Sequence, residues 1–250
     1  MCSDFGLPKL AVPEESWHRV ARAWLQKTVP PGNIQRWVDF HNHPTSQMHP
    51  ERWGSAALEW RIPILGCPLA QAYVDEHFRN LWNWGGDFWT SPESPLMQLA
   101  ISELSFLRRL AAFSGALIAV REIRKTIDSK KVLELRRGLG EGVLNFAYTT
   151  TLYSRISVPQ KCRLQQWSRS DSSPTTVAVL NSGWLLIACA CALLPAEEWN
   201  RFLSRLPHSV EKDLGQRNFS SEDSQLAWWC LRELVRVTVQ EKGDEHVQIS

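Results

Sequence analysis

The chain has 250 residues, of which 44% are apolar and 22% are charged. A chain of this length and composition can bury a core without disulfides or metals, which excludes a disordered protein, a collagen and a disulfide-rich miniprotein. Its 28 Lys and Arg residues nearly balance 26 Asp and Glu residues, and the net charge of +2 argues against a dedicated nucleic-acid-binding protein. The 13 Trp residues outnumber the nine Phe and three Tyr residues, which is unusual. Trp is frequent both in cores and at protein interfaces.

The N-terminal region, residues 1–94, is rich in Trp and is predicted to pack on the main body of the protein. It begins without the basic start and the long apolar run of a secretory signal, so we expect a cytoplasmic protein with reduced thiols. Apolar residues at helical spacing predict one helix over residues 14–29 and another over residues 68–81. The polar, Pro-containing segment 41–54 is predicted to be a loop, and the segment 82–92 a turn-rich aromatic loop.

The central region, residues 95–240, is predicted to form the helical core. A long helix-forming region over residues 96–120 is followed by an amphipathic helix over residues 132–146. The segment 148–158 has the β-branched and aromatic residues typical of a short strand. Residues 159–175 are polar and are predicted to form a mobile connection.

The segment 177–194 has eighteen residues and no charge. This length is at the lower limit for a membrane span, which makes a membrane protein one alternative. We expect a buried core helix instead, because Asn181, Ser182 and Gly183 interrupt the run and neither flank has an excess of positive charge.

Two amphipathic helices are predicted to close the core, over residues 199–206 and 226–237. Ser220 and Asp223 have the spacing of a capping box at the start of the second helix, with Asp in place of the preferred Glu. The charged tail, residues 241–250, is predicted to fray. These elements predict a mainly α fold, a single globular helical domain with at most a small β element.

Three histidines in the segment 41–54 form the best candidate for a metal site. His41 and His43 have the His-x-His spacing that metallohydrolases use to chelate one ion, and His49 follows closely. A metal-dependent hydrolase that uses these three side chains is therefore the alternative function.

Two other short motifs resemble ligand-binding signatures. Cys189 and Cys191 have the spacing of a metal or redox pair, but their apolar neighbours predict buried and inert thiols. Gly138, Gly140 and Gly142 resemble a phosphate loop, but the spacing of a dinucleotide-binding loop is missing and a helix break or close packing is predicted. We expect no catalytic residue, no bound metal and no cofactor.

The segment 121–137 carries seven basic and three acidic residues, which leaves an excess of four positive charges. Such a segment is either a solvated helix face or a docking surface for an acidic partner. The aromatic loop poses a similar choice, because exposed Trp residues concentrate binding energy at interfaces. The candidate partner-binding residues are Arg121, Arg124, Lys125, Arg136, Arg137, Trp82, Trp84 and Trp89.

Two segments of the predicted core share the order and spacing of features of a known family. In residues 110–147, an apolar helix that contains Gly115 leads into a basic turn at residues 121–125 and a second helix with Val132-Leu133-x-Leu135. In residues 181–207, Ser182-Gly183 and an apolar run precede Trp199 and a closing Arg205-Leu206-Pro207. In these features the chain resembles the SctK family of bacterial type III secretion systems, the YscK-like accessory proteins.

The resemblance covers residues 95–240, and the segment from His41 to Trp53 has no counterpart in it. It implies an adaptor that has no catalytic site and no cofactor. SctK-like proteins lie in the cytoplasmic sorting platform, peripheral to the inner membrane at the base of the injectisome. They join the pod protein SctQ to the inner-membrane ring protein SctD, with SctL and the ATPase SctN beyond. The implied role is in protein transport and virulence.

Overall fold

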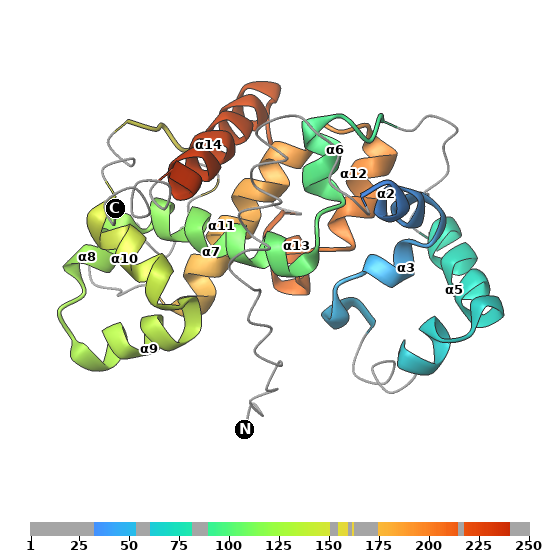
Figure 1. The fold of residues 1–250 in the computed structure, drawn as a ribbon, viewed down its shortest axis with the longest axis horizontal. Coiled ribbons are helices and arrows are strands. Elements are labelled where there is room, and N and C mark those ends of the chain that lie inside the picture. The colour runs from blue at the N-terminus through green and yellow to red at the C-terminus, as the bar shows by residue number, and fades with distance from the viewer. Residues whose placement is uncertain are drawn as a thin grey trace, which may run out of the picture.

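The computed structural model describes residues 33–53, 61–81, 90–150, 155–159, 162, 175–214 and 218–240. Within these ranges the elements are helices, and no strand is present (Figure 1). The prediction of a mainly α fold is therefore confirmed.

Two helices, α7 (Leu104–Ile118) and α11 (Thr176–Cys191), pack together at the centre of the molecule (Figure 1). Every residue is buried over residues 182–191 of α11 and over residues 110–118 of α7. A helix buried on all sides needs apolar or small residues around its whole circumference, and the charge-free run of α11 supplies them. The predicted buried core helix is confirmed. Among the described residues, no helix combines the length and apolarity that crossing a membrane requires.

Glycines allow the backbones of α7 and α11 to touch. A Cβ atom added at Gly115 would lie 1.9 Å from the carbonyl oxygen of Val179, and one added at Gly183 would lie 1.8 Å from the carbonyl oxygen of Ala111. Both distances are far shorter than van der Waals contact, so no larger residue fits while the helices keep this separation. The two glycines therefore set the distance between the central helices.

Two C-terminal helices, α13 (His208–Leu214) and α14 (Ser221–Gln240), also pack against α11. The backbone N–H of Asp223 donates to Ser220 Oγ over 3.1 Å, and the backbone N–H of Ser220 donates to Asp223 Oδ2 over 3.0 Å. This reciprocal pair satisfies two backbone donors at the start of α14. The predicted capping box is confirmed.

Three short helices, α8 (Val120–Lys125), α9 (Ser129–Leu139) and α10 (Glu141–Thr149), form one end of the molecule, on the left in Figure 1. Gly140 separates α9 from α10 with a φ of +94°, a backbone conformation that favours glycine. The predicted helix break in the three-glycine motif is confirmed.

The opposite end, on the right in Figure 1, contains α2 (Asn33–Asn42), α3 (Pro44–Gln47), a 3₁₀ helix η1 (Pro50–Trp53) and α5 (Pro68–Leu81). The helix predicted over residues 68–81 is confirmed as α5. The loop predicted over residues 41–54 is wrong, because α2 continues to Asn42 and α3 and η1 follow it directly. Pro is favourable at the first position of α3, where no helical hydrogen bond is lost.

The helix-forming region predicted over residues 96–120 is interrupted. It consists of α6 (Pro95–Ala100), α7 and the start of α8. The chain leaves the helical path after Ala100, and the carbonyl groups of Ala100 and Ser102 accept hydrogen bonds from the guanidinium group of Arg205. This buried donor, from the turn after α12 (Ala196–Leu203), replaces the helical donors that these carbonyls lack.

The strand predicted over residues 148–158 is not present in the described part of that segment. Tyr148 and Thr149 belong to α10, and residues 155–158 form no strand. Some other sequence predictions lie outside the described residues: the helix over 14–29, the aromatic residues 82–89, most of the connection over 159–175 and the tail 241–250.

Cys189 and Cys191 are fully buried in α11. Burial raises the pKa of the Cys191 thiol, because a thiolate loses its hydration there. A thiol held in its protonated form is a poor nucleophile and a poor metal ligand. The prediction that these thiols are buried is confirmed for both residues.

The glycine contact between α7 and α11 yields a test of the fold. Gly183→Ala is expected to lower the free energy of unfolding by about 3 kcal/mol, because the new methyl group would overlap a backbone carbonyl and push the helices apart. Gly142→Ala is the matched control, since a Cβ there meets nothing within 4 Å. Urea unfolding followed by Trp fluorescence measures both, and equal losses in the two variants would contradict the contact.

Candidate functional site

The seven basic residues of the segment 121–137, five of which are predicted to bind a partner, lie on α8 and α9. Six of the seven are exposed, and only Arg124 is partly buried. Ile127 in the link is 93% exposed, and Leu133 on α9 is also exposed. Single exposed apolar residues are common on protein surfaces, whereas exposed apolar residues that share a patch mark interaction sites, and Arg is enriched at interfaces.

Arg124 has a structural role within this end of the molecule. Its Nε donates to the carbonyl oxygen of Ala147 over 2.9 Å, and its Nη2 donates to that of Thr150 over 2.6 Å. These carbonyls lie at the end of α10, where helical donors are missing and a cation is favourable. Arg124 therefore holds α8 against α10.

Arg136 is paired with an acidic residue across the glycine break. Its Nε lies 2.8 Å from Glu141 Oε2, and both side chains are about half exposed. Exposed ion pairs contribute little to stability, but Glu141 reduces the positive charge that Arg136 offers to a partner. The other exposed cations of the segment 121–137, together with Ile127 and Leu133, are called the basic surface below: Arg121, Lys125, Lys130, Lys131 and Arg137.

The predicted Trp residues of the site, Trp82, Trp84 and Trp89, lie outside the described residues. The described residues nearest to them in the sequence are Leu81, at the end of α5, and Thr90. In the described part of residues 1–94, exposed apolar residues occur on α2 (Ile34), at Ile62 and on α5, where Leu69 and Tyr73 are 84% and 75% exposed. These two residues are one helical turn apart and lie on the same face of α5.

His41 is buried between α2 and α12. Arg201 Nη1 donates to His41 Nδ1 over 2.8 Å, so the neutral ring carries its proton on Nε2, which lies 3.6 Å from Glu198 Oε1. Burial and the charge of Arg201 lower the pKa of His41 to about 4. The ring is therefore neutral near pH 7.

Glu198, from the first turn of α12, is the buried acceptor next to His41. Its Oε1 accepts the backbone N–H of Thr90 over 2.6 Å, and its Oε2 accepts the Thr90 hydroxyl over 2.5 Å. The indole N–H of Trp37 on α2 donates to the Thr90 carbonyl over 2.9 Å. This network joins α2, α12 and the segment before α6, and no sequence pattern predicts it beyond the position of Glu198 at a helix start.

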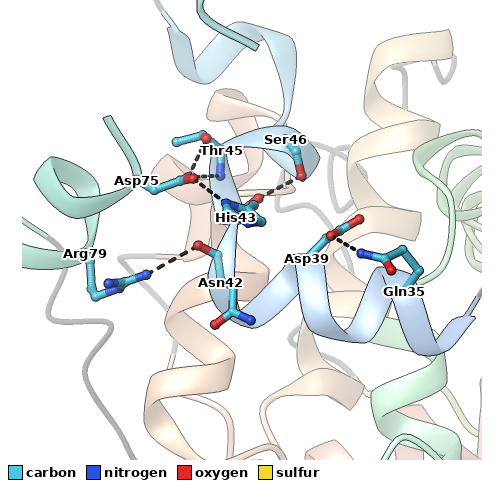
Figure 2. Close-up of polar contacts among 8 residues, drawn as sticks. All are labelled: Gln35, Asp39, Asn42, His43, Thr45, Ser46, Asp75 and Arg79. Atoms are coloured by element: carbon cyan, nitrogen blue, oxygen red, sulfur yellow. Dashed lines mark hydrogen bonds and ion pairs between the residues drawn. The ribbon is translucent and has the colours of Figure 1, made fainter. Parts of the chain in front are cut away.

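His43 belongs to a second polar cluster, in which Asp75 of α5 is the central acceptor (Figure 2). Asp75 is 1% exposed and accepts the backbone N–H of Thr45 over 3.0 Å, the Thr45 hydroxyl, and a bond from His43 Nδ1 over 3.1 Å. Arg79 on the same helix donates to the carbonyl oxygen of Asn42 over 3.3 Å. The cluster fixes the start of α3 against α5.

The neighbours of His49 differ from those of His41 and His43. Its Nδ1 accepts the backbone N–H of Glu51 over 3.3 Å. Burial lowers the pKa of His49 to about 4, against the opposing effect of the Glu51 carboxylate, and Arg52, Arg108 and Arg61 lower it further.

The three histidines of the predicted metal site are therefore not brought together as one ligand set. His41 contacts Arg201, His43 contacts Asp75, and His49 contacts Glu51. Across the described residues, no group of three or more His, Cys, Asp or Glu side chains has the arrangement needed to hold a metal ion. The His-x-His spacing brings two rings onto one ion only where the backbone is extended, whereas His41 lies in the last turn of α2 and is buried.

Comparisons with protein-family models, curated proteins and solved structures find no match to this chain. The likeness of residues 110–147 and 181–207 to SctK-like proteins therefore depends on the sequence features themselves.

The buried His41 yields a prediction about pH. Because the native state holds the pKa of His41 near 4, below its unfolded value of about 6.5, unfolding takes up a proton between these values and stability falls as the pH is lowered through this window. The loss for this one group is about 2–3 kcal/mol between pH 7 and pH 4. Urea unfolding of the wild type and His41→Gln at several pH values measures it; the same pH dependence in both proteins would contradict the prediction.

Proposed function

We propose that this chain is a non-enzymatic adaptor of a bacterial type III secretion sorting platform. It would join an SctQ-like pod protein to the cytoplasmic domain of an SctD-like ring protein, with SctL and the ATPase SctN reached through the pod. The place of action would be the bacterial cytoplasm, at the inner membrane beneath the secretion apparatus. The order and spacing of features in residues 110–147 and 181–207 support this assignment.

The basic surface is the observation that carries the proposal. Five exposed cations and the exposed Ile127 lie on α8, α9 and their link, and Arg124 holds this end rigid by binding the last carbonyls of α10. A rigid cationic surface raises the rate of association with an acidic partner and fixes its orientation. The apolar Ile127 side chain would supply the buried anchor that charges alone do not provide.

The distance between the two ends of the molecule also supports an adaptor. The basic surface lies at the α8–α10 end, whereas the exposed Leu69 and Tyr73 lie on α5 at the opposite end (Figure 1). The tightly packed α7 and α11 lie between them. An adaptor needs two surfaces that partners can occupy at the same time, and a stiff body that holds those partners in a fixed relation.

Charge reversal of the basic surface tests the proposal. Combined replacement of Arg121, Lys125 and Arg137 by Glu is expected to weaken binding to the acidic partner at least tenfold, since attractive charges become repulsive. Arg124 and Arg136 are left unchanged because one stabilises α10 and the other is paired with Glu141. Affinities for purified SctD-like and SctQ-like proteins of the same bacterium, measured at low and high salt, give the readout.

Arg232→Glu is the control for this experiment, because it reverses an exposed charge on α14, away from the basic surface. It should leave both affinities unchanged. Wild-type affinity in the triple variant, at either salt concentration, would remove the basic surface from the interface.

A further inference from the structure

A cavity of about 320 Å³ lies between α2, α3 and the start of α7. Met48, Ile101 and Arg205 line it and are almost completely buried, so they form its floor. Arg36 and Glu103 also line it and are partly exposed, so they form its entrance. This volume is sufficient for a single side chain or a small molecule.

The lining of the cavity has a net positive charge. Three guanidinium groups, those of Arg36, Arg61 and Arg205, contribute to it, against the carboxylates of Asp39 and Glu103. Arg36 and Glu103 form an ion pair, and Asp39 accepts a hydrogen bond from the side chain of a neighbouring glutamine on α2. One positive charge is left over, which a single negative charge would neutralise.

Arg205 is a buried cation without an acidic partner among the described residues. It is 3% exposed, and its guanidinium group donates to the carbonyl oxygens of Gln47, Ala100 and Ser102. Neutral carbonyls satisfy its N–H groups but leave its charge uncompensated, which is unfavourable in a buried position. Burial accordingly lowers the pKa of Arg205 to about 9.

Two buried polar atoms at the cavity have no hydrogen-bond partner in the described part of the chain. One is Arg61 Nε, which is a donor, and the other is Gln47 Oε1, which is an acceptor. The orientation of the Gln47 amide is set by its Nε2, which donates to the carbonyl oxygen of Arg36 over 2.8 Å. Buried polar atoms are rarely left unpaired, so a ligand with both an acceptor and a donor is expected here.

We propose that this cavity binds the carboxylate of an acidic residue presented by a partner protein. The carboxylate would accept from Arg61 Nε and neutralise the excess charge, and the backbone N–H beside it would donate to Gln47 Oε1. A phosphate group, which carries between one and two negative charges at neutral pH, fits less well because the Asp39 carboxylate also lines the cavity. This proposal rests on the proposed adaptor function in one respect only, namely that a partner protein supplies the carboxylate.

An NMR titration of the full-length, ¹⁵N-labelled chain tests this proposal without any partner. The probes are N-acetyl-glutamate N-methylamide and its uncharged glutamine counterpart, compared with inorganic phosphate at constant ionic strength. The glutamate probe is expected to shift the Arg61 Nε–H signal in a saturable manner and to bind roughly tenfold or more tightly than the glutamine probe, since a charged hydrogen-bond partner is lost in the latter.

Two substitutions locate the binding. Arg61→Gln is expected to weaken binding of the glutamate probe at least tenfold, and Arg61→Lys, which keeps the charge and removes the Nε donor, is expected to weaken it less. Arg232→Gln on α14 is the control and should have no effect. Backbone amide spectra of each variant report whether the fold is retained.

Several outcomes would overturn the proposal: equal affinity for the two probes, no saturable shift, tighter binding of phosphate, or unchanged binding in a folded Arg61 variant. Probe binding combined with a failure of the whole chain to bind SctD-like or SctQ-like proteins would uphold the carboxylate site and reject the adaptor function.

Discussion

The contact between the backbones of α7 and α11 is the constraint on which the rest of the structure depends. Gly115 faces Val179 and Gly183 faces Ala111 with no room for a Cβ atom, so the two helices lie closer than side chains would allow. The helix α14 packs on both members of this pair, and α13, α10 and α6 each pack on one of them. A wider separation between α7 and α11 would therefore displace the helices that pack on them, and with those helices the surfaces that we assign to partners.

Long-range polar contacts complete the arrangement by joining the α2–α5 end to the C-terminal half of the chain. Arg201 binds His41, Glu198 binds Thr90, and Arg205 binds carbonyl groups on both sides of the turn between α6 and α7. All three of these α12-region side chains are nearly inaccessible to solvent. Removal of one member of such a buried pair leaves the other unsatisfied, which costs about 3–5 kcal/mol for a charge. The stiffness required of an adaptor thus has a physical basis in both the apolar and the polar interior.

The sequence predicted those features that depend on local pattern. The charge-free run predicted the buried helix α11, the spacing of Ser220 and Asp223 predicted a capping box, and glycine predicted the break at Gly140. It did not predict the interruption after Ala100, because the donor that stabilises it, Arg205, comes from a distant part of the chain. The separation of His41 from His43 was not predicted for the same reason, since their partners, Arg201 and Asp75, come from distant helices. Charge counting found the basic segment, but it could not distinguish exposed cations from Arg124, which binds α10.

We propose that two partners occupy separate surfaces of this chain at the same time. Mass photometry of the full chain mixed with an SctD-like cytoplasmic domain and an SctQ-like pod protein from the same bacterium measures this directly. A complex that contains all three proteins is expected, and no complex of the two partners when the chain is omitted. Competition of the two partners for the chain, or their association without it, would rule out simultaneous binding through this chain.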